Sequence, residues 1–335
     1  MKAVDSKTFK RKLAEAGGHA GSDKLPMIRT TMNRSDWIVL AILAVIWGGA
    51  FFFIGVAVKH VPPLTYVCLR LTIAASAMWI YVKASGKNLG LPREVWGAII
   101  LLALLNNALP FTLFGWGQTH IASGLASILN ATTPNWGVVV AHLLTDDERM
   151  TPRKIAGVLL GFGGVLTMIG PSLLSNIGTN ALAQLACVAA SLSYALAAVW
   201  ARRFRKLGVS PVSVTTGQLT AGAIIMLPLS LFVDRPWTHA FPPLGALAAI
   251  TALGLFCTAF GYVLYFRLID RAGATNALLV TLLVPPVAIV LGAAFLSETL
   301  APQDFIGLAL IALGLAAIDG RVVSAWTERR LRTAA

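Results

Sequence analysis

The sequence predicts an all-α membrane protein whose ten transmembrane helices form two inverted five-helix repeats. Three observations lead to this fold class. The 335-residue chain is 57% apolar and only 12% charged, and its mean hydropathy of +0.76 lies outside the range of soluble domains. Its apolar residues form stretches long enough to cross a bilayer. The second half of the chain also repeats the first at a fixed offset.

Ten stretches of mostly apolar residues approach the roughly 20 residues that a helix needs to cross a hydrocarbon core of ~30 Å. In chain order they cover 36–58, 63–82, 95–116, 123–144, 152–169, 180–201, 211–233, 244–268, 272–296 and 303–318. Residues 1–35 are expected to be a cytoplasmic tail, either disordered or an extension added before a native start at Met32. Residues 321–335 are expected to be a second cytoplasmic tail.

The basic residues fix the expected orientation. If the N-terminus is cytoplasmic, 24 of the 27 Lys and Arg residues fall in the tails and inside loops, and only Lys59 and Arg235 fall in outside loops. Arg70 remains, within the second apolar stretch. This bias follows the positive-inside rule, so ten crossings with both termini in the cytoplasm are expected. The net charge of +13 therefore reflects topology, and no nucleic-acid partner is expected.

An internal repeat appears when the chain is compared with itself at an offset of 150 residues. The matched pairs include Glu148 with Glu298, Pro152 with Pro302, Gly157 with Gly307 and Gly164 with Gly314. The two expected repeats cover 36–170 and 180–320. Because five crossings carry the chain to the opposite side, the second repeat must be inverted relative to the first. Inverted repeats are typical of transporters that bind substrate near the bilayer midplane.

Three segments carry a resemblance to a known family. The first begins with "IWGGAFFFIG" at residue 46, the second reads "LFGWGQTHIASGLASILNATTP" from residue 113, and the third covers 260–311. They resemble the paired EamA domains of the drug/metabolite transporter superfamily, with the closest likeness to YddG-type aromatic amino-acid exporters. The resemblance covers roughly residues 36–320. It implies a ten-helix exporter of the bacterial inner membrane that moves amino acids or similar small metabolites outward.

Polar residues and prolines interrupt the fourth stretch. Asn130 and Thr133 share a helical face, and Pro134 removes a backbone hydrogen bond beside them. Pro285 and Pro286 lie beside the matching position in the second repeat. Polar side chains in hydrocarbon are costly unless they face the interior or water. We therefore expect Asn130 and Thr133 to bind substrate and the three prolines to act as hinges; a packing kink is the alternative.

Two further helices carry candidate substrate-binding residues. Helical spacing aligns four residues of the third stretch and three of the eighth, so amides and aromatic rings could form facing walls of a cavity. The two groups are Asn107, Phe111, Phe114 and Gln118, and Thr258, Tyr262 and Tyr265. Trp47 and Trp136 are candidates because they adjoin Gly-rich or Pro-containing positions. Ordinary packing or lipid contact is the alternative for each aromatic residue.

Arg70 is the only basic residue deep in an apolar stretch, and no Asp or Glu lies at mid-helix. An intramembrane Arg either binds a substrate carboxylate or phosphate, or bonds helix-end carbonyls at a membrane face. Its neutral counterpart in the second repeat, Gln218, favours the structural role. Without an intramembrane carboxylate as a proton or sodium carrier, uncoupled transport or exchange is expected.

The sequence therefore predicts an alternating-access exporter of amino acids, aromatic or neutral ones first, and of related small metabolites. Its expected partners are this small-molecule substrate and membrane lipid, and the chain is expected to act as a monomer without cofactor or metal. An exporter of cationic drugs, or an exchanger of phosphorylated or nucleotide-linked metabolites, is the alternative. A membrane-embedded enzyme is a weaker one, because no nucleophile, metal-ligand or acid cluster stands out.

Overall fold

The computed structural model describes residues 32–86, 89–145, 148–174, 179–272, 277 and 279–319. Most of the expected N-terminal tail, residues 1–31, and the whole expected C-terminal tail lie outside these described residues. Within the described ranges every regular element is helical and none is a strand. The all-helical part of the fold prediction is therefore confirmed.

The first half of the chain contains nine helical elements, counted over the described residues. They are α2 (Arg34–Ala57), α3 (Pro63–Ala84), the short 3₁₀ helix η1 (Arg93–Val95), α4 (Trp96–Ala103), the π-helical segment η2 (Leu104–Ala108), α5 (Leu109–Gln118), α6 (Ser123–Asn130), α7 (Thr133–Leu144) and α8 (Pro152–Leu174).

The second half contains nine further helical elements, again counted over the described residues. Its elements are α9 (Thr179–Lys206), α10 (Pro211–Leu229), the π-helical η3 (Ser230–Asp234), the 3₁₀ helix η4 (Pro236–Thr238), α11 (Leu244–Ala252), the π-helical η5 (Leu253–Phe260), α12 (Gly261–Ala272), α14 (Val280–Leu296) and α15 (Pro302–Asp319).

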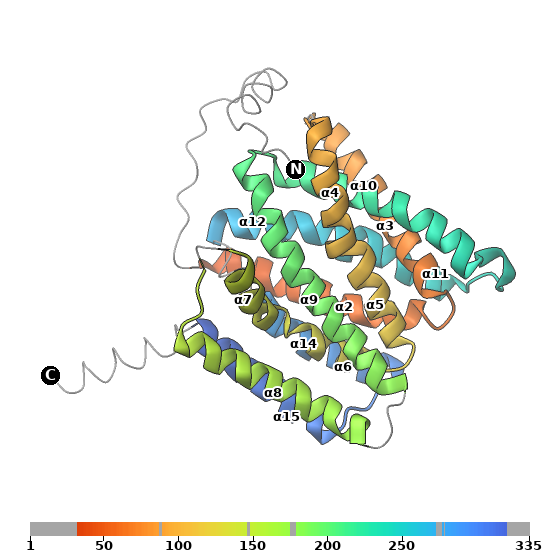
Figure 1. Ribbon diagram of the computed structural model, residues 1–335. Helices are drawn as coiled ribbons and strands as arrows, with labels where there is room; N and C mark the ends of the chain where they lie inside the picture. The colour runs from red at the N-terminus through yellow and green to blue at the C-terminus, as the bar shows by residue number, and fades with distance from the viewer. Residues whose placement is uncertain are drawn as a thin grey trace.

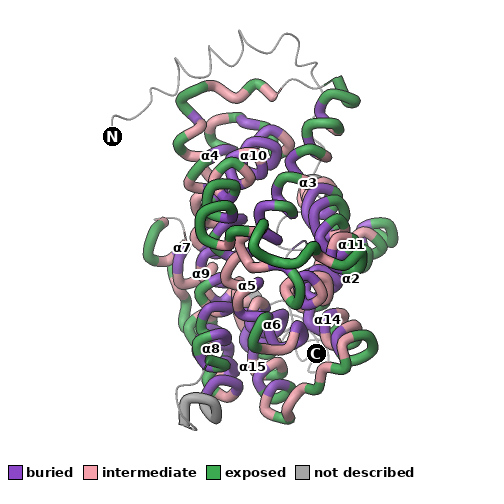
Figure 2. The backbone as a smooth tube through the Cα atoms, turned by 90° about the vertical axis from the view of Figure 1, so that its right-hand side faces the viewer, coloured by how far each residue is buried: buried purple, intermediate pink, exposed green. Residues whose placement is uncertain are grey.

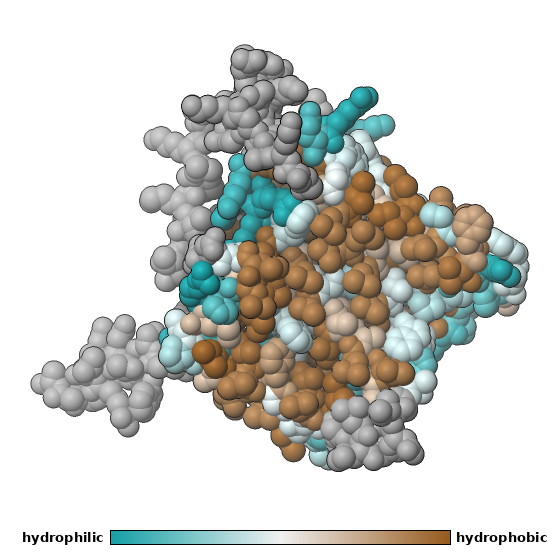
Figure 3. Space-filling model, in the orientation of Figure 1, coloured by the Kyte–Doolittle hydropathy of each residue, from teal (hydrophilic) through white to brown (hydrophobic). Residues whose placement is uncertain are grey.

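Apolar length makes this a multi-pass membrane protein. Seven helices within the described residues are long and apolar enough to cross a membrane, and the shorter apolar helices Val280–Leu296 and Pro302–Ile318 accompany them. The stretch 123–144 is divided into α6 and α7, each too short to span alone. Large apolar side chains cover most of the face in Figure 3, with hydrophilic residues gathered toward its edges. Such a surface suits contact with lipid.

Several helices begin where their sequence dictates. At the start of α2, the Asn33 side chain accepts a hydrogen bond from the Asp36 N–H at 2.9 Å, and the Asp36 carboxylate accepts one from the Asn33 N–H at 3.1 Å. This capping box satisfies two otherwise unpaired backbone donors. Pro63 and Pro211 occupy the first turns of α3 and α10, where the missing N–H has no partner to lose.

Helices from the two halves of the chain pack in pairs. In Figure 1, α8 and α15 lie side by side at the bottom of the bundle, and α3 lies near α10 at the opposite end. A Cβ atom added to Gly157 would lie 2.6 Å from the Gly314 carbonyl oxygen, and one added to Gly164 would lie 2.6 Å from the Gly307 carbonyl oxygen. Only Gly permits this approach. The order of these contacts makes α8 and α15 antiparallel.

The pair α3 and α10 is also antiparallel. The Thr65 hydroxyl, in the first turn of α3, bonds to Ser230 directly after α10 at 3.0 Å, and Trp79 near the end of α3 donates to Thr220 at 3.1 Å. Figure 2 shows the buried residues facing the interior of the bundle.

Two hydrophobic cores meet inside the bundle. One includes Phe111 and buried residues of α3, α10 and η5, and the other includes Phe114 and buried residues of α6, α9 and α14. Tyr194 of α9 packs against both. The third predicted helix therefore contributes to both cores within a single turn, and the polar residues of the candidate site lie near this junction.

Candidate functional site

Arg70 is a buried cation on α3. Only 5% of its surface is exposed. Its Nε donates a hydrogen bond to the Thr258 hydroxyl at 2.9 Å, and its Cζ lies 3.7 Å from the centre of the Phe111 ring. Among the residues that the structure describes, no carboxylate forms an ion pair with it. The side chain is thus held by α3, α5 and η5 inside the bundle, rather than at the helix-end carbonyls that the sequence favoured.

Two π-helical segments present polar groups around Arg70. η2 carries Asn106 and Asn107, and η5 carries Thr258. Thr258 donates its hydroxyl proton to the Leu253 carbonyl, 2.7 Å away and five residues earlier, which leaves its oxygen free to accept from Arg70. A π segment changes the phase of a helix and is frequent at functional sites. Both segments lie at corresponding positions of the repeat, close to 150 residues apart.

An amide and phenol network lies beside the cation. Asn106 Nδ2 lies 3.1 Å from both the Gln218 side-chain oxygen and the Tyr262 hydroxyl, and Tyr262 donates to Asn107 Oδ1 at 3.4 Å. Asn107 is fully buried, and its Nδ2 has no hydrogen-bond partner. Such an unpaired buried donor is costly and requires an explanation. The network thus joins the predicted residues Asn107 and Tyr262 with two that sequence analysis did not assign to binding.

A cavity of about 560 Å³ reaches this network at Tyr262. It opens between the end of α3, the start of α10 and α12, and its wall includes Met78, Tyr81, Ser213, Thr215, Phe266 and Arg267. This volume lies in the range of small-molecule sites. A second cavity of about 510 Å³ lies at the opposite end of the α3 and α10 pair and includes Thr65, Cys68 and Ser230. Arg70 follows the second cavity along α3 and precedes the first.

A row of rings extends from the cavity to α2. The ring centres of Tyr262 and Phe266 are 6.3 Å apart, those of Phe266 and Tyr265 are 6.1 Å apart, and those of Tyr265 and Trp47 are 5.1 Å apart. The predicted residues Trp47, Tyr262 and Tyr265 therefore lie along one continuous aromatic row. Such rings can stack on a flat organic substrate.

The remaining predicted binding residues lie at the break between α6 and α7. Thr133 donates to the Asn130 backbone oxygen at 2.7 Å and lies 3.3 Å from its side-chain oxygen. Trp136 packs on Phe162 of α8 with ring centres 4.5 Å apart, and its buried Nε1 has no partner. No hydrogen bond within the described residues joins this group to Arg70. Their role in binding stays a prediction.

The predicted hinge prolines have unequal surroundings. Pro134 lies in the first turn of α7, directly after the interruption at Ala131 and Thr132. Pro285 and Pro286 instead lie inside the continuous helix α14. The expected weak point is therefore a hydrogen-bonded turn between two helices in the first repeat and an unbroken helix in the second. A role in gating stays a prediction for all three.

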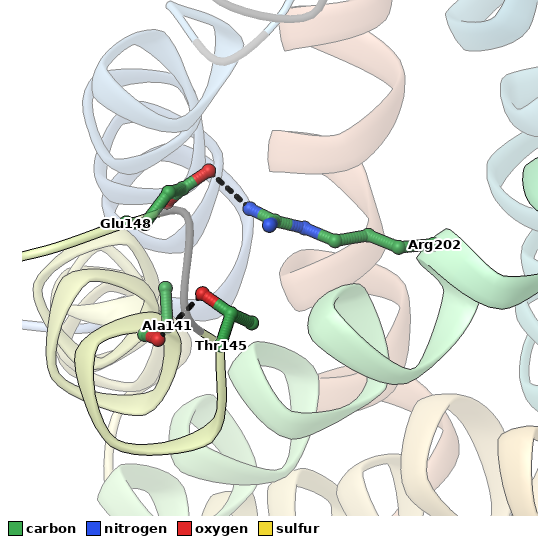
Figure 4. Close-up of polar contacts among 4 residues, drawn as sticks. All are labelled: Ala141, Thr145, Glu148 and Arg202. Carbon is green, nitrogen blue, oxygen red and sulfur yellow. Dashed lines mark hydrogen bonds and ion pairs between the residues drawn. The ribbon is translucent and has the colours of Figure 1, made fainter.

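The matched acids Glu298 and Glu148 also differ in their partners. The Glu298 carboxylate accepts hydrogen bonds from the Ser123 N–H at 2.9 Å and the Ser123 hydroxyl at 2.7 Å, so it caps the N-terminus of α6. Glu148 forms an ion pair with Arg202 of α9, which Figure 4 shows beside the end of α7. Both acids therefore join the two halves, but only Glu298 caps a helix N-terminus.

Comparison with known proteins follows the same division of the chain. The EamA-like transporter family matches residues 35–170 and 181–318. An uncharacterized transporter of Archaeoglobus fulgidus is 26% identical over 83% of this chain and 96% of its own length. A probable terminal-alkyne amino-acid exporter of Streptantibioticus cattleyicolor is 27% identical over 87% of this chain and 95% of its own. One solved structure, 20% identical, has a TM-score of 0.61 and covers 85% of this chain and 98% of its own, which shows similarity of fold.

Proposed function

Because this chain belongs to the EamA-like transporter family, we propose that it exports amino acids with aromatic or neutral side chains and related small metabolites. The observation that carries this proposal is the cavity of about 560 Å³ with Tyr262 in its wall, because that phenol joins the cavity to an amide network deep in the bundle. Aromatic rings line this cavity, and the amide groups lie at its inner end. This combination suits a small substrate with one apolar and one polar end.

The relatives support a transporter of this kind. Several are transporters, and one is a probable exporter of an amino acid. We assign substrate binding to Trp47, Asn107, Phe111, Tyr262 and Tyr265 beside the cavity and the aromatic row. Asn130, Thr133 and Trp136 form a second group at the helix break, which the substrate contacts when the bundle rearranges.

We further propose alternating access by two inverted halves, with α6 and α7 together forming one of ten crossings. Three features support it: α8 runs antiparallel to its repeat counterpart α15, α3 runs antiparallel to α10, and π segments recur at matching positions. Counterparts that run in opposite directions are expected of inverted repeats. Rocking of the halves would then expose the site to each side, with hinges at Pro134, Pro285 and Pro286.

The charge distribution supports an orientation with both termini in the cytoplasm of a bacterial cell. In that orientation the cavity beside Tyr262 opens toward the cytoplasm, because α3 ends and α10 begins there. The contact between Glu298 and Ser123 then lies on the outer side and holds it closed. Loading from the cytoplasm agrees with export. The absence of a carboxylate at mid-helix favours uncoupled transport or exchange.

The experiment that tests the proposal is counterflow in proteoliposomes with a panel of labelled amino acids, run with and without a pH gradient. Aromatic and neutral amino acids should exchange fastest, at rates that the gradient does not change. Exchange of cationic dyes or sugar phosphates, with no amino-acid flux, would replace this function with the corresponding alternative.

A further inference from the structure

The charge of Arg70 has no counter-charge among the described residues. Asp234 contacts α3 five residues before Arg70, where it accepts hydrogen bonds from the Thr65 N–H at 2.7 Å and the Thr65 hydroxyl at 2.9 Å. An unpaired buried cation costs several kcal/mol in a protein interior, and more in hydrocarbon. A purely structural role is poorly served by such a group, because a neutral side chain could bond to Thr258 without that cost.

The guanidinium is held in one orientation by its contacts with Thr258 and Phe111. The hydrogen bond to Thr258 takes only Nε, and the Phe111 ring covers one face of the plane. The two Nη groups are the donors that bind a carboxylate in a forked arrangement. Cation and ring together also resemble a pre-positioned binding group, since a fixed side chain loses little entropy when a ligand arrives.

A buried donor without a partner lies one helical turn from a residue that contacts Arg70. On one helix the network residue Asn107 precedes the Arg70 contact Phe111 by four residues. On the other helix the Arg70 contact Thr258 precedes the network residue Tyr262 by four. The contacts of Arg70 and the amide network therefore share the same two helices. The Asn107 Nδ2 is buried and unbonded. A buried cation without a counter-charge and a neutral donor without an acceptor therefore lie on neighbouring turns of the same helices.

We propose that Arg70 binds the carboxylate of the transported substrate, with Asn107 donating to the same group. This rests on the proposed export function and narrows its substrates to small monocarboxylates whose apolar part contacts the aromatic row. The carboxylate reaches the cation when the Tyr262 hydroxyl leaves Asn107 Oδ1, a bond that is 3.4 Å long and therefore weak, and donates to the substrate instead. Phosphorylated cargo is disfavoured because it would leave charge unmatched by a single Arg.

The test compares L-phenylalanine with L-phenylalaninamide, which lacks the carboxylate, as inhibitors of counterflow in proteoliposomes. The wild type should prefer the acid by about tenfold to a hundredfold, since a hydrogen bond to a charged group contributes about 1.5–3 kcal/mol. Arg70→Gln should abolish the preference, and Arg70→Lys should keep part of it. Arg205→Gln, which removes an exposed Arg at the end of α9, should leave it unchanged.

A second measurement separates this inference from the export proposal. Phenylacetate should raise the melting temperature of the purified wild type but not of Arg70→Gln, whereas benzyl alcohol should affect both equally. If the wild type transports neither amino-acid compound, the export proposal fails and the melting shift alone decides the role of Arg70. An acid preference that survives in Arg70→Gln, or an equal phenylacetate shift in both proteins, would overturn that role.

Discussion

Tyr262 connects an open cavity with a buried polar network, so its hydroxyl and its ring have separate tasks. Tyr262→Phe keeps the ring in the cavity wall and removes only the hydroxyl. Asn106 retains its bond to Gln218, so we expect the fold to persist. Loss of a neutral hydrogen bond of about 1 kcal/mol should raise the half-saturating substrate concentration about fivefold. Counterflow titration measures this, and an unchanged value at an unchanged melting temperature would remove Tyr262 from the site.

Some residues of the candidate site could be predicted from their spacing in the sequence. Asn107, Phe111 and Tyr262 could be selected because polar and aromatic side chains recur there at helical spacing. Asn106 could not, because a regular helix would turn it away from Asn107, whereas the π segment η2 lets both amides reach Tyr262. The pairing of Arg70 with Thr258 joins residues 188 positions apart, and no local pattern encodes it.

At the scale of an element, α6 depends on an acid from the other half of the chain. Glu298→Gln should weaken the charge-assisted hydrogen bonds to the first turn of α6 and lower the stability by about 1–2 kcal/mol. The matched control is Glu148→Gln, at the corresponding repeat position, where the pair with Arg202 is partly exposed and should contribute less than about 1 kcal/mol. The melting temperatures of both purified variants measure this difference. An equal decrease in the two variants would contradict the special role of Glu298.

A second prediction at this scale concerns the contact of α8 with α15. Gly157→Ala places a methyl group against the Gly314 backbone, and such overpacking costs typically about 1–3 kcal/mol. Gly163→Ala lies on the same helix, where a Cβ would meet no atom within 4 Å, so it should be neutral or slightly stabilising. A melting temperature that Gly157→Ala leaves unchanged or raises, as Gly163→Ala does, would mean that the close contact with Gly314 does not limit stability.

The bounds of the helices were largely predictable and the interruptions were not. Apolar length and prolines place the starts of α3, α8 and α10 at the residues expected from the sequence. Pro134 indicated a weak point in 123–144, but it could not indicate that the helix is replaced by a turn at Ala131 and Thr132. Pro285 and Pro286 predicted a similar weak point in the second repeat, yet α14 continues through them. Packing against neighbouring helices decides at which proline site the helix is interrupted.

At the scale of the molecule, the contacts between halves follow a two-fold pattern. Gly157 approaches Gly314, and Gly164 approaches Gly307. Gly307 is the repeat counterpart of Gly157, and Gly314 is that of Gly164, so exchanging the two halves converts one contact into the other. The same relation pairs α3 with α10. Under the proposed alternating access, two halves related in this way would offer two equivalent arrangements of one packing scheme, one open to each side. A site at their junction then needs only small differences in contacts, such as the Glu298 cap, to favour one side.

Inversion makes matched positions appear on opposite faces of the membrane, and labelling can detect this. Thr151 and Thr299 are exposed residues in the corresponding connections before α8 and α15. In whole cells, a membrane-impermeant maleimide should label Thr299→Cys directly and Thr151→Cys only after permeabilisation. The native Cys68, Cys187 and Cys257 are buried, so the unmodified protein provides the background. Labelling of both positions from the same face would mean that the halves run in parallel, and a parallel pair could not open one shared site to each side in turn.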